Sequence, residues 1–154
     1  DLDFLFIVLH HPIVTHATQG LSRTSVCKGQ KTTFIAPHGV EDNEKKLKLL
    51  LEDFSQSHPL ANLLVFSGHN HNYERYIDKK ITYIVTGGGG ATPYMVKRDP
   101  SDAYHENGST FHYCKISLDD MGLVFEMFKL NSEDGKWKQG DTFRLPRLSN
   151  SSTK

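Results

Sequence analysis

The sequence lacks the features that mark several broad functional classes. Its 154 residues include 18 basic and 18 acidic ones, so the formal net charge is zero. A neutral chain without a Lys/Arg cluster gives no electrostatic reason to expect nucleic acid as a partner. The longest apolar run, residues 4–9, is far too short to span a bilayer, so no membrane span is expected. What is left is a single domain, for which this length allows a real core.

Cysteine is scarce as well. Cys27 and Cys114 are too few for a disulfide framework and lack the spacing of a structural zinc site, which leaves free thiols or a single bridge. The chain begins with Asp1 instead of Met and has no basic signal-peptide segment, which indicates a processed chain or a piece of a longer one. Glycosylation sequons begin at Asn107 and Asn150 and matter only in a secreted protein. These residues therefore leave the compartment unknown.

Short apolar runs and one amphipathic stretch define the expected elements. The expected strands are, in chain order, 4–9, 63–66, 81–85, 111–118, 123–130 and 142–145. The first three are mainly apolar, as in strands buried on both faces, and each runs into His or Gly at once or after one residue. Residues 41–54 are expected to form an amphipathic helix, and residues 15–40 a long surface loop. The domain is expected to cover residues 1–146, with a polar tail at 147–154.

Two pairs of histidines follow two of these strands. On an extended backbone, His69 and His71 would project to the same side with Cβ atoms about 6–7 Å apart, which suits two metal ions about 3.5–4 Å apart. Gly68 before them would allow a sharp turn. His10 and His11 end the first strand, where alternation should let only one of them face a shared metal cluster. Each pair alone could equally be exposed loop residues.

Three motifs occur in a fixed order along the chain. Residues 8–12 read Val-Leu-His-His-Pro, residues 67–75 read Ser-Gly-His-Asn-His-Asn-Tyr-Glu-Arg, and residues 83–91 read Tyr-Ile-Val-Thr-Gly-Gly-Gly-Gly-Ala. They resemble the His-x-Pro motif, the Gly-His-x-His motif and the following glycine turn of calcineurin-like metallophosphoesterases. The Tyr-Glu-Arg ending resembles their purple-acid-phosphatase-like branch. Residues 111–130 are similar to the closing hairpin of the family, so the resemblance covers residues 3–145.

The resemblance implies a fold, a ligand set and a reaction. The fold class would be α/β, as the C-terminal half of a four-layer αββα sandwich with mixed β-sheet. His10 and His69 would bind one metal ion and His71 the other, the ions being Fe, Zn or Mn. The substrate would be a phosphate ester, either a monoester or a diester, with both ions neutralising the developing charge. A secreted or extracytoplasmic location is also implied.

Other residues near these motifs have less defined roles. His11 has no ligand counterpart in the family, and we expect it behind the ligands or in contact with substrate. Asn70 and Arg75 could orient ligands, although Arg75 could equally be a salt-bridged structural residue. Gly88 and Gly89 would let the backbone approach the site closely. No Gly-Lys-Ser/Thr follows the glycines, which excludes a P-loop.

The carboxylate ligands of the family are missing. Its first half supplies Asp-x-His, Gly-Asp and Gly-Asn-His motifs, and none of them occurs in this sequence. Neutral imidazoles cannot balance two cations, and a catalytic zinc ion normally has about three protein ligands. We therefore expect an N-terminal half, on the same or a separate chain, to complete the enzyme, and this chain alone to be inactive.

Two alternatives stay open. The chain could be a non-catalytic relative that binds or scaffolds, with residues 15–40 as a contact surface. It could also be a module that binds one metal ion through His10 and His69. Lys97 and Arg98, which follow the glycine turn, could attract phosphate, although a solvated face is the expected role.

Overall fold

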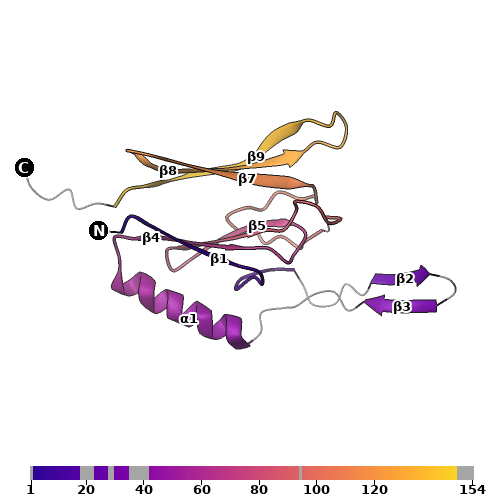
Figure 1. Ribbon diagram of the computed structural model, residues 1–154, viewed down its shortest axis with the longest axis horizontal. Coiled ribbons are helices and arrows are strands. Elements are labelled where there is room, and N and C mark those ends of the chain that lie inside the picture. The colour runs from indigo at the N-terminus through magenta and orange to yellow at the C-terminus, as the bar shows by residue number, and fades with distance from the viewer. Residues whose placement is uncertain (1, 18–22, 28–29, 35–41, 94, 149–154) are drawn as a thin grey trace, which may run out of the picture.

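The computed structural model describes residues 2–17, 23–27, 30–34, 42–93 and 95–148. Its elements are β1 (Phe4–Leu9), β2 (Arg23–Cys27), β3 (Gln30–Phe34), α1 (Asp42–Ser57), β4 (Asn62–Ser67), β5 (Tyr73–Asp78), β6 (Ile81–Thr86), β7 (His112–Asp119), β8 (Gly122–Leu130) and β9 (Trp137–Pro146). They form three layers in Figure 1: the sheet β7-β8-β9, the sheet β1-β4-β6-β5, and α1 against the outer face of the latter. The hairpin β2–β3 projects away from these layers.

The sheet β1-β4-β6-β5 is mixed. Strands β1, β4 and β6 run parallel, and β5 is antiparallel to β6. The carboxyl ends of the three parallel strands therefore meet at one edge, which is where ligands bind in open α/β sheets. The α/β class with a mixed sheet is confirmed.

Two apolar cores hold the layers together. Between the two sheets, a buried cluster includes Leu64, Phe66, Tyr73, Ile84, Tyr104, Leu123, Phe125 and Met127. Between the mixed sheet and α1, Leu47, Leu51 and Phe54 of the helix join a cluster that contains Leu63 and Val65. The expected helix is thus present, and its Leu50 is 64% exposed. Leu47, Leu51 and Phe54 follow the i, i+4, i+7 stripe, and Leu50 lies on its flank.

Two parts of the chain differ from the sequence prediction. β5 was not predicted, because Glu74, Arg75 and Asp78 hide its strand pattern; Glu74 and Arg75 are nevertheless buried. Residues 15–40 contain the hairpin β2–β3 instead of loop alone. Its strands are rich in Thr and Ser, so they lack the apolar alternation that predicts a strand. The rest of residues 18–41, and residues 149–154 of the expected tail, lie outside the described residues.

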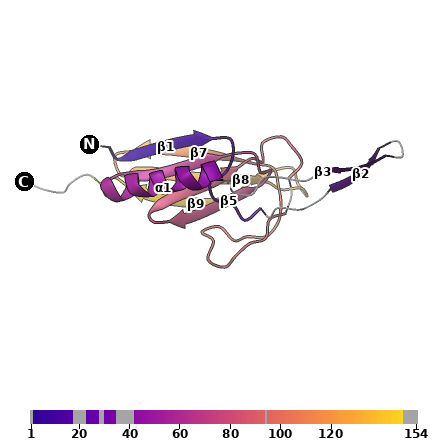
Figure 2. The same cartoon turned by 90° about the horizontal axis from the view of Figure 1, so that it is seen from below.

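The space between the sheets is open along one side. There β1 and β7 are the edge strands of their sheets, and Figure 2 shows both on the same side of the molecule. Phe6 and Val8 of β1 and Ile116 and Leu118 of β7 lie on the faces that the two sheets turn to each other. They are nevertheless 37%, 79%, 40% and 54% exposed, respectively. We call these four residues the open side.

Two further expectations can be compared with the structure. Cys114 is a free thiol, one of the two states that the sequence left open. Among the described residues, no helix has the length and apolar character that crossing a membrane requires.

Candidate metal centre

Three imidazoles meet at the carboxyl edge of the mixed sheet. The ring centroids of His10 and His69 are 5.0 Å apart, those of His11 and His69 4.4 Å, and those of His10 and His11 4.9 Å. One ring nitrogen of each histidine lies within 4.8 Å of the other two. Nε2 of His10 and Nδ1 of His69 are 3.1 Å apart. Residues 59 positions apart in the sequence thus form one cluster of nitrogen donors.

Tight backbone turns place His69 in this cluster. The Gly68 N–H donates to the His10 carbonyl at 3.1 Å, which extends the contact between β1 and β4 beyond the strand ends. His69 has φ 60°, and the Asn70 N–H donates to the Gly68 carbonyl at 2.6 Å, a three-residue turn centred on His69. A left-handed conformation costs a non-glycine residue about 1–2 kcal/mol. Backbone strain of this kind is common at functional sites.

These turns correct two geometric expectations. The segment is not extended, because a second three-residue turn, from the Asn72 N–H to the Asn70 carbonyl at 2.8 Å, follows the first. His71 does not belong to the group of three converging histidines among the described residues, so its ligand role stays a prediction. The expectation that only one of His10 and His11 could face the cluster is wrong. β1 ends at Leu9, so strand alternation no longer separates the two side chains.

The donor set fits one metal ion. Two nitrogens that bind a zinc ion tetrahedrally at about 2.0–2.1 Å are about 3.3–3.4 Å apart. The 3.1 Å between His10 Nε2 and His69 Nδ1 is close to that value. One ring nitrogen of His11 lies within 4.8 Å of a ring nitrogen of each of the other two histidines, so small imidazole rotations could bring all three to one ion. Imidazole suits Zn, Cu, Fe and Ni. His10 and His11 are exposed and His69 is half-buried, so an ion there would remain accessible. In the described part of the chain no carboxylate joins this group.

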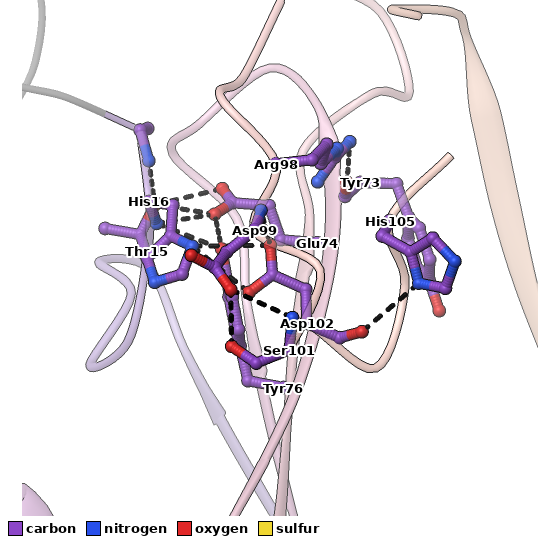
Figure 3. A network of polar contacts seen from close by, with 11 residues as sticks. Thr15, His16, Tyr73, Glu74, Tyr76, Arg98, Asp99, Ser101, Asp102 and His105 are labelled. Atoms are coloured by element: carbon purple, nitrogen blue, oxygen red, sulfur yellow. Dashed lines mark hydrogen bonds and ion pairs between the residues drawn. The ribbon is translucent and has the colours of Figure 1, made fainter. Parts of the chain in front are cut away.

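A buried carboxylate fixes the loops around the cluster. Glu74 is fully buried and accepts hydrogen bonds from the Thr15 hydroxyl at 2.9 Å, the His16 N–H at 2.9 Å and the Tyr76 hydroxyl. Burial and then the Glu74 carboxylate raise the pKa of Tyr76, which keeps its hydroxyl a donor. Figure 3 shows Thr15 and His16 beside Glu74 and Tyr76.

Asn70 connects this network to the cluster. It is fully buried, and its Nδ2 donates to Thr15 Oγ1 at 2.8 Å. The loop after β1 and the loop after β4 are therefore tied together next to His69. The sequence assigned no role to Thr15 or Glu74, because 59 residues separate them and no local pattern reveals the contact.

Arg75 joins the two sheets. Its guanidinium binds Asp141 of β9 through Nε at 2.7 Å and Nη2 at 3.0 Å, and Nη2 also donates to the Ala103 carbonyl at 2.9 Å. The same group lies 4.9 Å from the ring centroid of Phe143. Of the two roles considered, these contacts favour the structural one; orientation of ligands by Arg75 stays a prediction.

The glycine turn approaches its neighbours at two positions. A Cβ on Gly87 would lie 2.1 Å from the Asn70 carbonyl oxygen, and one on Gly88 would lie 2.2 Å from Nδ1 of His112. At Gly89, a Cβ would have no atom within 4 Å, so close approach is confined to Gly87 and Gly88. His112 is buried, and its Nε2 lies 3.1 Å from Thr86 Oγ1.

Comparison with known proteins shows a shared fold and no family. No protein-family model and no curated protein matches the chain. GAP50, the anchor in the inner membrane complex of Plasmodium, matches 94% of this chain with a TM-score of 0.59 and 18% identity. Vps29 of Chaetomium thermophilum matches 82% of it with a TM-score of 0.38 and 11% identity. The chain spans 37% of the GAP50 chain and 59% of the Vps29 chain, less than two thirds of each. The chain is therefore similar in fold to a part of GAP50.

Proposed function

We propose that this chain is the C-terminal half of a metallophosphoesterase domain and that the complete protein hydrolyses phosphate esters. The observation that carries the proposal is the convergence of His10, His11 and His69 at the carboxyl edge of the mixed sheet. Two of them come from motifs that resemble the ligand motifs of that family. The cluster, the order of the motifs and the α/β layers all agree with it.

The chain's own residues would hold the metal and fix its surroundings. His10 and His69 would bind one ion and His71 a second, as the resemblance implies. His11, which lies in the same cluster, would add a ligand to the first ion. Such ions, Fe, Zn or Mn, would supply positive charge to the phosphoryl group. Asn70, through Thr15, would keep the His69 turn in place.

The open side supports the idea of a half domain. Parallel strands are normally buried on both faces and flanked by neighbours, yet β1 is an apolar parallel strand at a sheet edge. Val8, 79% exposed, and the other three residues of the open side would be covered if further strands continued both sheets past β1 and β7. The proposed other half would supply these strands, the carboxylate ligands and the fourth layer of the sandwich. The 37% share of GAP50 that the chain spans fits the same idea.

Phosphatase assays on two polypeptides test the proposal. The first is this chain; the second is a longer polypeptide that also carries the proposed N-terminal half. With an aryl phosphate and Zn, Mn or Fe, we expect no turnover from this chain and clear turnover from the longer one. His69→Ala in the longer polypeptide should reduce kcat at least about 100-fold, since a metal ligand is lost.

His58→Gln is the matched control, because His58 is exposed at the end of α1 and stacks on Phe54, outside the cluster. It should leave turnover within about twofold of the unmodified polypeptide. Robust turnover by this chain alone would contradict the half-domain proposal, and an unaffected His69→Ala variant would contradict the role of the cluster.

A non-catalytic role is the second candidate. It is favoured by the fold similarity to GAP50, which is described as an anchor. A folded longer polypeptide that binds metal but shows no turnover, and that lacks the Asp-x-His, Gly-Asp and Gly-Asn-His motifs, would favour this candidate.

A further inference from the structure

A pocket lies beside the loop that follows β1. It has a volume of about 360 Å³ and is lined by Thr15, His16, Ala17, Lys97, Arg98 and Asp99. Thr15 Oγ1 accepts the hydrogen bond from Asn70, the residue after His69. Thr15 therefore belongs both to the pocket lining and to the hydrogen-bond network next to His69.

Two cations line this pocket without an ion-pair partner. Among the described residues, no carboxylate lies within 4.0 Å of the charged nitrogens of Lys97 or Arg98. Nη2 of Arg98 donates to the Tyr73 carbonyl at 2.7 Å (Figure 3), and its guanidinium carbon lies 5.3 Å from the ring centroid of Tyr104. Its Nε and Nη1 are buried and have no hydrogen-bond partner in the described part of the chain. Buried guanidinium N–H groups without acceptors are costly, so an anion that a side-chain rotation brought into contact with them would be stabilising.

The carboxylates nearby are occupied by other donors. Asp99 accepts from the Ser101 N–H at 2.9 Å and the Ser101 hydroxyl at 2.6 Å. Asp102, whose side chain is 2% exposed, lies 3.2 Å from Nδ1 of His16 and accepts from the Asp99 N–H. The pocket lining thus contains two cations that have no ion-pair partner among the described residues. It also contains one carboxylate bound by Ser101 and one histidine held by a buried carboxylate.

We propose that this pocket binds a phosphate-type oxyanion, a second anionic group of the substrate beside the ester at the imidazole cluster. Phosphate oxygens accept strong hydrogen bonds from Arg and Lys. The substrate class would then be a diphosphate or bisphosphate rather than a simple monoester. The substrate assignment rests on the proposed function, whereas the anion pocket stands on its own contacts.

Titration of the metal-free chain with orthophosphate, followed by amide NMR shifts, tests the pocket. Saturable shifts are expected at residues 15–17 and 97–99. Lys97→Gln should raise the dissociation constant for phosphate about tenfold, because one charged hydrogen bond is lost. Lys97 is exposed and makes none of the described hydrogen bonds, so this variant should fold normally. Lys46→Gln, which removes an exposed charge from α1, should bind as the unmodified chain does.

Three results would contradict phosphate binding in this pocket. The first is an absence of shifts at residues 15–17 and 97–99. The others are an unchanged phosphate affinity in Lys97→Gln, and a loss of affinity in Lys46→Gln as large as that in Lys97→Gln.

The failure of this inference and that of the proposed function can be told apart. His69→Ala should leave phosphate affinity in the metal-free chain unchanged, because the pocket does not use the imidazole cluster. In the longer polypeptide, Lys97→Gln should raise KM for a bisphosphate about tenfold and leave KM for an aryl monophosphate unchanged. Turnover with no such KM difference would overturn the substrate assignment alone, and phosphate binding without turnover would contradict only the proposed function.

Discussion

At the scale of single residues, the turn at His69 determines why residue 87 must be glycine. His69 adopts φ 60°, and the turn that results brings the Asn70 carbonyl against Gly87 of the neighbouring strand end. A glycine is therefore required at 87 by contact with backbone, which cannot move aside as a flexible side chain can. Close approach was predicted at Gly88 and Gly89, whereas it occurs at Gly87 and Gly88, so the prediction for Gly89 is wrong.

Gly87→Ala should lower the free energy of unfolding by about 1–3 kcal/mol, because the added Cβ would overlap the Asn70 carbonyl. Urea denaturation measures the effect. Gly89→Ala is the matched control, since a Cβ there meets no atom within 4 Å, and it should change stability by less than about 0.5 kcal/mol. Equal losses in both variants would refute the contact as the cause.

His112 should make stability depend on pH. Burial lowers its pKa below the usual 6.5, and the Thr110 carbonyl only partly opposes this. As pH falls below about 6.5, the unfolded chain takes up a proton at this position while the folded one does not, so the free energy of unfolding falls until the folded pKa is reached.

Denaturation at pH 7.5 and pH 5 compares the native chain with His112→Gln. The native chain should lose more stability on acidification than the variant, by up to about 1.4 kcal/mol per pH unit between the two pKa values. An identical pH dependence would show that His112 does not contribute.

At the scale of elements, apolar strands were predictable and polar ones were not. β1, β4 and β6 are mainly apolar runs, and their parallel order brings both histidine motifs to one edge as expected. β5 escaped prediction because its buried charges are satisfied by residues distant in the sequence: Glu74 by Thr15, and Arg75 by Asp141. Such partners leave no local signal in the sequence. The convergence of His10 and His69 was predicted from the motifs, but the inclusion of His11 depends on where β1 ends.

The Arg75–Asp141 pair should be a main link between the two sheets. Both side chains are nearly buried, 11% and 9% exposed, so removal of one leaves an uncompensated charge. Arg75→Met should therefore destabilise by about 3–5 kcal/mol in urea denaturation. Adding Asp141→Leu to it should restore part of that loss.

The control is Lys115→Met, which breaks the exposed pair with Glu126 on β7 and β8 and should cost less than about 1 kcal/mol. Equal effects of Arg75→Met and Lys115→Met, or purely additive effects of the Arg75 and Asp141 changes, would contradict a buried link between the sheets.

At the scale of the whole molecule, the three layers and the open side are what a half sandwich would present. Apolar side chains of β1 and β7 remain exposed along the open side, with Val8 the most exposed of them at 79%. On the opposite edge, Ile77 of β5 is also 62% exposed. The sequence indicated an incomplete ligand set through its missing carboxylate motifs. The position of the open side could not be predicted, because it depends on which strands become the edges of each sheet.

Zinc titration by calorimetry, on the chain and on single histidine variants, tests the cluster most directly. One ion per chain should bind through the ring nitrogens that lie within 4.8 Å of one another. His10→Ala and His69→Ala should each abolish this binding, His11→Ala should weaken it about 10- to 100-fold, and His58→Gln should leave it unchanged. Unaltered stoichiometry and affinity in both His10→Ala and His69→Ala would contradict a metal centre at this edge of the sheet.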